Sequence, residues 1–241
     1  MENTNFVELM RRKDFNPAVT YNQVQPLIKL TYAWMLIGLI VTTAVALITV
    51  NTPALLGMIN SATLLITFVI QIGLVIVLTA AMPRLSPGLA ASLFLAYSAL
   101  TGFTLSVILL IYTTSAITTA FLATVALFGS LTFFAFTTQL DLSRWQNILF
   151  VALIGLVIAM IINFFLGSSL IDYVISLFGV LIFTGLTAVD TQKLKRLASS
   201  PEIQEDGTLR ARVSIFMALE LYLDFINLFL FILRLLGGGR R

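Results

Sequence analysis

The sequence predicts an all-α integral membrane protein with seven transmembrane helices. Hydrophobic residues make up 59% of the 241 residues, and the mean hydropathy is +1.02. Charged residues make up 10% of the chain, whereas soluble globular domains contain roughly 25%. Because so few polar side chains cannot coat a water-soluble fold of this size, the composition excludes a soluble enzyme, a nucleic-acid-binding protein and a disordered regulator.

Polar and turn-forming residues divide the apolar sequence into separate spans. Between Leu30 and Leu140 the only charged residue is Arg84, and this stretch is much longer than the roughly 20 residues that one span needs. Clusters of Pro, Gly, Asn, Ser and Thr supply the breaks. Because the runs are continuously apolar rather than alternating, they exclude a transmembrane β-barrel. The predicted spans are residues 30–50, 61–82, 88–112, 115–138, 147–166, 171–192 and 213–236.

The segments outside these spans are short. Residues 1–28 are expected to form a cytoplasmic tail, residues 29–237 the membrane domain, and residues 238–241 a C-terminal tail. The N-terminal segment lacks the apolar core and cleavage site of a signal peptide. A polar loop, 198–212, is expected to separate the sixth span from the seventh. An alternative for part of the N-terminal tail is a short interfacial helix that uses Phe6, Val7, Leu9 and Met10.

Basic residues predict the orientation of the spans. In membrane proteins, lysine and arginine concentrate in cytoplasmic segments. Here they precede the first span and occupy every second connection, whereas Asp172 is the only charged residue of the opposite connections. The N-terminus is therefore expected in the cytoplasm. Seven full spans place Arg234, Arg240 and Arg241 outside, against this bias, so a last segment that re-enters the cytoplasmic side is the alternative. The basic residues on the cytoplasmic side are Arg11, Arg12, Lys13, Lys29, Arg84, Arg144, Lys193, Lys195, Arg196, Arg210 and Arg212.

The chain contains neither cysteine nor histidine. The sequence therefore excludes disulfide bonds, thiolate nucleophiles, sulfur-ligated metals, histidine bases and histidine-ligated zinc. A response to pH near neutrality must come mainly from carboxylates. No cofactor is expected, apart from calcium as an ion that is bound or transported.

Three carboxylates fall within or at the edge of predicted spans. Asp190 lies near the cytoplasmic end of the sixth span, and Glu220 and Asp224 lie four residues apart on one face of the seventh. A carboxylate at membrane depth is costly unless it is paired, protonated or hydrated, so it indicates function. Two carboxyls that share an apolar site cannot both ionise freely. Such a pair can sense pH, and when deprotonated it can bind calcium with added carbonyls or waters.

Structural roles are the alternative for each of these residues. Asp190 can pair with Lys193 or Lys195 at the interface, Asp224 can be satisfied by a neighbouring helix, and Glu220 can face the cytoplasm. Arg84 can extend to the membrane surface and fix the topology, or it can fold inward onto Asp224 or Asp190 as a latch.

Small residues on the third span predict close helix packing. Ser98, Gly102 and Ser106 recur every four residues and lie on one helix face. In membranes such a row lets two backbones approach closely. We therefore assign this row to packing rather than to a site.

Four segments carry motifs that are typical of one family of membrane proteins. They are 218–229, ALELYLDFINLF; Asp190-Thr191-Gln192; 97–102, YSALTG; and 84–88, RLSPG. The first two resemble the signature of the Bax inhibitor-1 family of transmembrane proteins, and the last two resemble its bacterial inner-membrane members. The resemblance covers essentially residues 29–237.

The resemblance implies a seven-helix fold whose last helix is surrounded by the other six. It also implies a pH-sensitive calcium leak gated by an aspartate pair, which Asp190 and Asp224 match, and latched by an arginine, which Arg84 matches. Bacterial relatives are linked to a membrane-bound AAA protease, so such a protease is a candidate partner. Some relatives have an acid in the middle of the second span, where this chain has only Gln71 and Gly73, and this departure puts calcium permeation in question.

The leading hypothesis is a pH-sensitive calcium (cation) leak channel in the bacterial inner membrane. The first alternative is a membrane-embedded regulator of a protease or other partner that conducts no ions. A proton-coupled transporter is less favoured because no inverted repeat is visible. An intramembrane aspartyl protease is also less favoured, because Leu221-Tyr222-Leu223-Asp224 lacks the Gly-x-Gly-Asp motif and Pro53-Ala54-Leu55 precedes both acids. No enzymatic activity is expected.

Overall fold

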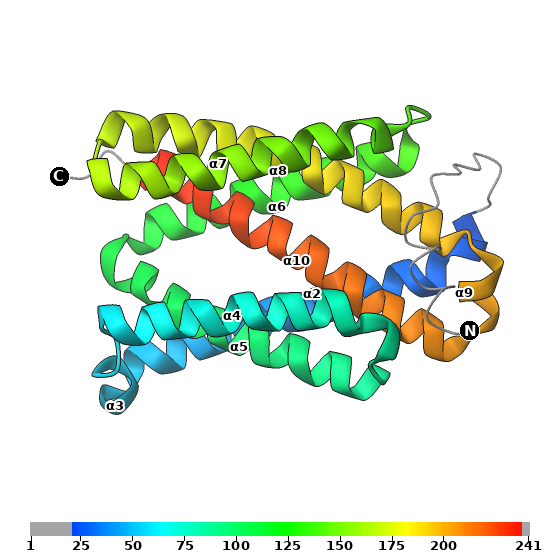
Figure 1. Ribbon diagram of the computed structural model, residues 1–241, viewed down its shortest axis with the longest axis horizontal. Coiled ribbons are helices and arrows are strands. Elements are labelled where there is room, and N and C mark those ends of the chain that lie inside the picture. The colour runs from blue at the N-terminus through cyan, green and yellow to red at the C-terminus, as the bar shows by residue number, and fades with distance from the viewer. Residues whose placement is uncertain (1–20, 238–241) are drawn as a thin grey trace. The chain divides into compact units, whose positions relative to one another are not determined.

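The computed structural model describes residues 21–237, and within them every regular element is a helix (Figure 1). Seven of the helices contain segments that are long and apolar enough to cross a membrane. The prediction of an all-α protein with seven spans is confirmed. These seven helices are α2 (Tyr21–Asn51), α4 (Ser61–Ala81), α5 (Pro87–Ile111), α6 (Thr114–Thr137), α7 (Gln146–Leu166), α8 (Ser169–Ala198) and α10 (Gly207–Gly237).

The predicted breaks are helix ends with local capping. Asn60 accepts a hydrogen bond from the Thr63 amide at the start of α4, and Ser86 caps α5 through the Leu89 amide. Gly167 ends α7 with a φ of 63°, a left-handed conformation that glycine adopts without strain. Two short elements occupy connections, α3 (Pro53–Leu56) after α2 and the 3-10 helix η1 (Met82–Arg84) after α4.

The predicted polar loop 198–212 is wrong in its extent. α8 continues to Ala198, a short helix α9 (Pro201–Glu205) follows, and α10 begins at Gly207. The reason is a local cap, because the Asp206 carboxylate accepts hydrogen bonds from the amides of Thr208 and Leu209. This cap starts α10 six residues before the predicted span.

The N-terminal helix also starts earlier than the predicted span. α2 begins at Tyr21, so residues 21–28 of the predicted tail are helical. The rest of that tail, the interfacial helix proposed around Phe6 to Met10, and the C-terminal tail 238–241 lie outside the described residues.

The chain forms two compact units. Unit 1 comprises Met1–Thr113 and Arg196–Tyr222. In it α2 packs along α5, and α4 packs against α5 as well (Figure 1). A Cβ atom added to Gly102 of α5 would lie 2.4 Å from the carbonyl oxygen of Thr42 of α2. The small-residue row of the third span therefore serves helix packing, as its spacing predicts.

Unit 2 comprises Thr114–Lys195 and Leu223–Arg241. Phenylalanine side chains of α10 pack on its neighbours here. Phe225 meets Phe121 and Phe128 of α6 edge to face, and Phe231 stacks on Phe183 of α8. Gly179 of α8 leaves the space that the Phe231 ring fills, since an added Cβ would lie 2.6 Å from that ring.

α10 is the buried helix of the fold. In its apolar window 72% of residues are buried, against 11–28% in the other six spans. Large apolar side chains are exposed on those six helices, as expected where helices face lipid rather than water. The predicted central position of the last helix is confirmed.

Candidate functional site

Asp224 is a buried carboxylate in the interior helix. Its residue is 4% exposed, on the half of α10 that belongs to unit 2. Phe225 and Leu228, which follow it in the helix, are also buried. A carboxylate in such an apolar position is costly and is rarely retained for packing alone. Asp224 is therefore the best-supported site residue among the sequence candidates.

Asp190 belongs to the same unit and lies in the last third of α8. It is half-buried, whereas Thr191 and Gln192, the next two residues, are fully buried. The two aspartates predicted to act together are thus carried by α8 and α10 of unit 2, and α10 packs on α8 through Phe231.

Glu220 and Arg84 belong to unit 1. Glu220 is half-buried on α10, and Arg84 is exposed at the end of η1. The turn that carries Arg84 is fixed by a different arginine, because Arg212 of α10 donates a hydrogen bond to the carbonyl oxygen of Pro83 at 2.9 Å. The latch role of Arg84 stays a prediction.

No group of three or more histidine, cysteine, aspartate or glutamate side chains that could hold a metal occurs within residues 21–237. Calcium takes 6–8 oxygen ligands. A calcium ion held by Asp190 and Asp224 would therefore need backbone carbonyls or water to complete its ligands, because two carboxylates offer at most four oxygens.

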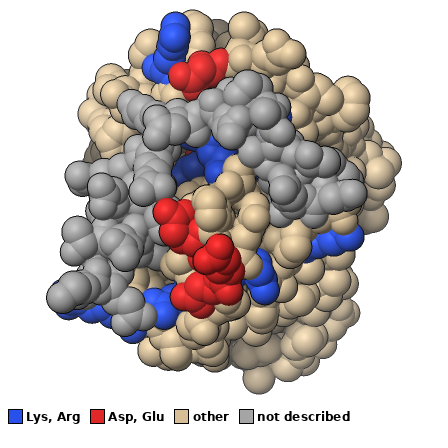
Figure 2. All heavy atoms as spheres, turned by 90° about the vertical axis from the view of Figure 1, so that its right-hand side faces the viewer, with Lys and Arg blue, Asp and Glu red and all other residues tan. Residues whose placement is uncertain are grey.

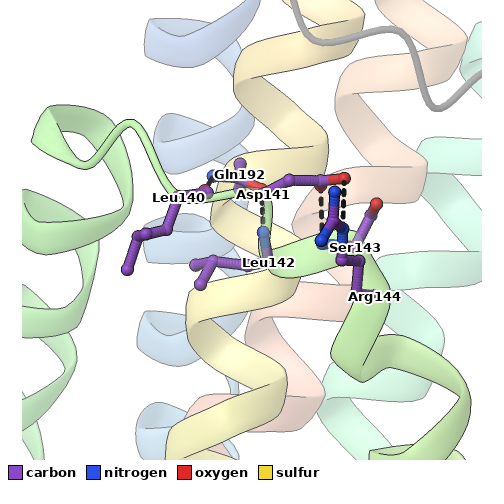
Figure 3. A network of polar contacts seen from close by, with 6 residues as sticks. All are labelled: Leu140, Asp141, Leu142, Ser143, Arg144 and Gln192. Carbon is purple, nitrogen blue, oxygen red and sulfur yellow. Dashed lines mark hydrogen bonds and ion pairs between the residues drawn. The ribbon is translucent and has the colours of Figure 1, made fainter.

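The side chain of Gln192 holds the connection between α6 and α7 (Figure 3). Its amide nitrogen donates to the carbonyl oxygen of Leu140 at 2.7 Å, and its amide oxygen accepts from the amide of Leu142 at 2.8 Å. One helical turn further on, Lys195 donates to the carbonyl oxygen of Phe136 at 2.7 Å. The segment that follows Asp190 in the sequence is thus tied to the end of α6 and to the connection after it.

Unit 1 contains a buried polar network that the sequence analysis missed. The hydroxyl of Tyr222 on α10 lies 2.6 Å from Oγ1 of Thr42 on α2. Thr42 Oγ1 also lies within hydrogen-bond distance of the carbonyl oxygens of Gly38 and Ser98. Tyrosine and threonine in apolar runs do not by themselves predict such a network. Either hydroxyl can hydrogen-bond to a carbonyl of its own helix, and either side chain can face lipid.

The second span contributes Gln71 to a further buried contact in unit 1. Its amide nitrogen donates to Oγ1 of Thr101 at 3.0 Å, and Thr101 in turn donates to the carbonyl oxygen of Tyr97. Where some relatives are expected to have an acid, this chain therefore has a neutral amide that is hydrogen-bonded to α5.

Both basic and acidic side chains are visible on the face drawn in Figure 2, whereas the spans expose mainly apolar residues. In unit 1, α9 and the residue after it contribute the acids Glu202, Glu205 and Asp206. This distribution agrees with a segment that lies outside the apolar part of a membrane.

Comparisons with known proteins agree with the sequence motifs. Residues 24–241 match the family model described as "Inhibitor of apoptosis-promoting Bax1". Escherichia coli "Inner membrane protein YbhL" is 44% identical over 211 residues, which cover 87% of this chain and 90% of that protein. A protein of Deinococcus radiodurans without an assigned role is 40% identical, over 97% of this chain and 99% of its own length. A protein of Borreliella burgdorferi, also without an assigned role, is 39% identical over 87% of this chain and 90% of its own length.

Proposed function

Because the chain belongs to the Bax inhibitor-1 family, we propose that it is a pH-sensitive leak channel for calcium or a related cation in a bacterial inner membrane. The observation that carries the proposal is the burial of Asp224 in the interior helix of a seven-span protein. With no histidine in the chain, carboxylates are the groups that can change charge near neutral pH.

The chemistry of the proposed site follows from its carboxylates. Deprotonated Asp190 and Asp224 offer oxygen ligands to a hard cation, and Glu220 lies one turn before Asp224 on α10. Protonation removes the negative charges and weakens cation binding. Arg84 competes with the cation for the same carboxylates in this proposal, and protonation of the acids would release it.

The orientation belongs to the proposal as well. The basic residues in alternate connections support an N-terminus in the cytoplasm, with Asp190 near the cytoplasmic surface. At about 1.5 Å per residue, the 31 residues of α10 extend about 46 Å, which is long enough for a full span and supports it over the re-entrant alternative.

The test is calcium flux into dye-loaded proteoliposomes between pH 5 and pH 8. We expect flux that depends on pH in the wild type, and a changed pH profile in Asp224→Asn and Asp190→Asn. The matched control is Asp172→Asn, because Asp172 is an exposed aspartate in the first turn of α8. This variant should behave like the wild type.

Two results would overturn the proposal. Absence of flux above that of empty liposomes at every pH would leave the alternative, a regulator that acts on a membrane protease or another partner without conducting ions. Calcium binding that is unchanged in the Asp190→Asn, Asp224→Asn double variant would remove these residues from the site.

A further inference from the structure

In the α6–α7 connection, Gln192 binds backbone groups of the residue before Asp141 and of the residue after it. The carbonyl of Leu140 and the amide of Leu142 flank Asp141, and the side-chain amide of Gln192 pairs with both (Figure 3). We call this pair of hydrogen bonds the Gln192 clamp. It joins groups that are about 50 residues apart in the chain and lie in the same unit.

The clamp matches the chemistry of a buried amide. Gln192 is 0% exposed, and a buried amide that lacks partners is costly. Because its nitrogen donates and its oxygen accepts, one glutamine satisfies a carbonyl and an amide that the connection itself leaves without backbone partners. Among the other side chains only asparagine carries the same two groups, and it is one methylene shorter.

The connection is also ordered around the clamp. Asp141 accepts a hydrogen bond from the amide of Ser143 at 3.0 Å, which caps the 3-10 helix η2 (Leu142–Trp145). Its other oxygen lies 3.8 Å from Nε of Arg144. Ser143 is buried, so the turn is packed rather than projecting. The clamp therefore attaches α8 to a segment with a defined shape.

The clamp lies in the same helical turn as Asp190. A helix advances about 1.5 Å per residue, so Asp190 and Gln192 lie about 3 Å apart along the axis of α8. Lys195 follows Gln192 by three residues and binds the carbonyl of Phe136 at the end of α6. The side chains of Gln192 and Lys195 thus attach the C-terminal part of α8, which carries Asp190, to α6 and to the connection after it.

We propose that Gln192 is a positioning residue for Asp190, which acts by clamping the α6–α7 connection to the end of α8. This proposal deepens the proposed function, since it concerns the same carboxylate. Loss of the clamp frees the turn that contains Asp190, exposes its carboxyl group more often, and changes how the channel responds to pH.

The variants separate the hydrogen bonds from the volume of the side chain. Gln192→Met keeps the length and removes both bonds. Gln192→Glu restores them only when its carboxyl group is protonated, because an ionised carboxylate cannot donate to Leu140 and repels its carbonyl oxygen. Glutamate has an ordinary pKa of about 4.3, so its carboxyl group is mostly protonated at pH 3.5 and ionised at pH 7.5. The matched control is Gln146→Met, the same exchange at the start of α7, outside the clamp.

None of these substitutions replaces a neighbouring charged residue, and comparison with Gln146→Met at the same pH accounts for the protonation of the neighbouring acids. The charged residues on α8 near the clamp and on the clamped connection are Asp190, Lys193, Lys195, Asp141 and Arg144.

The first measurement is hydrogen–deuterium exchange of peptides that cover residues 136–145, in full-length protein in lipid nanodiscs. Each variant is compared with Gln146→Met at the same pH. We expect faster exchange in Gln192→Met at both pH values, and in Gln192→Glu at pH 7.5 only. Exchange in Gln192→Met equal to that of the control would show that the clamp does not hold the connection, and would overturn the proposal.

The second measurement is the rate at which a carbodiimide modifies Asp190, followed by mass spectrometry of the peptide. This reaction needs no ion flux, so it decides the positioning role even if the wild type proves not to be a channel. We expect severalfold faster modification in Gln192→Met, and recovery of the wild-type rate in Gln192→Glu at pH 3.5. Equal rates in Gln192→Met and Gln146→Met would overturn the positioning role while leaving the proposed channel function open to its own test.

Discussion

The hydroxyl of Tyr222 lies 2.6 Å from Oγ1 of Thr42, although 180 residues separate the two in the chain. The contact joins the interior helix α10 to α2 within unit 1. Thr42 Oγ1 can donate its single proton to the carbonyl oxygen of Gly38 or Ser98, which leaves its oxygen to accept a hydrogen bond from the Tyr222 hydroxyl. The ring of Tyr222 is fully buried and meets Phe94 and Tyr97 edge to face.

We predict that this hydrogen bond stabilises the fold by about 0.6 kcal/mol, and by no more than about 1.7 kcal/mol, as is typical of polar contacts between membrane helices. A double-mutant cycle of Tyr222→Phe and Thr42→Val measures this coupling in the free energy of unfolding in mixed micelles. Thr43→Val is the control, because Thr43 is exposed and bonds only within its own helix. A cycle with Thr43 should show no coupling, and zero coupling for the Thr42 pair would contradict the prediction.

Gly102 provides a second test of the packing in unit 1. A methyl group there would lie 2.4 Å from the backbone carbonyl oxygen of Thr42, which has no flexible side chain to move aside. We expect Gly102→Ala to destabilise the fold by about 1–3 kcal/mol, as overpacked interiors usually do.

Gly129 supplies the control for this substitution. It lies within α6, and an added Cβ there would meet nothing within 4 Å. Gly129→Ala should therefore stay within about 1 kcal/mol of the wild type, with a tendency to stabilise because alanine favours helices. Similar unfolding free energies for the two alanine variants would show that α2 and α5 do not approach as closely as described.

The topology is directly testable because the chain has no native cysteine. With a cytoplasmic N-terminus, Ser115→Cys and Ser169→Cys place a thiol on the outer side, whereas Gln139→Cys and Glu205→Cys place one inside. All four positions are exposed at or near the ends of helices. A membrane-impermeant maleimide applied to intact spheroplasts should label only the first two. Labelling of the second pair alone would show that the orientation is the reverse of the predicted one, with Asp190 near the outer side.

In the proposed function, the response to pH depends on the acids rather than on the basic groups. We expect the change in flux between pH 5 and pH 8 to shrink in Asp224→Asn, because the variant has lost a group that can bind and release a proton there. The effect of calcium on protonation follows from the linkage between proton binding and cation binding. If calcium binds the deprotonated acids, added calcium should favour the release of protons. A proton-release assay with a pH dye in lightly buffered detergent solution measures this, and no release on calcium addition would separate the cation from the acids.

The sequence determined the features that the bilayer imposes on each segment separately. The lengths of the apolar runs predict seven spans, and residues such as Asn60, Ser86 and Gly167 end or begin helices by local hydrogen bonds or backbone conformation. The same one-dimensional rule singles out Asp224, because a carboxylate within an apolar run is visible without knowledge of its neighbours. Family motifs add the seven-helix arrangement and its interior last helix.

Only the tertiary structure decided which polar groups pair. The sequence shows Gln192, Thr42 and Tyr222 as polar residues, but their partners lie 50 to 180 residues away. The early start of α10 was missed for a different reason, since the Asp206 cap satisfies its first amides in a segment whose polarity resembles that of a loop. Hydropathy reflects the free energy of transferring one segment from water into lipid. Hydrogen bonds between helices depend instead on distances between segments, which are set only when the chain folds.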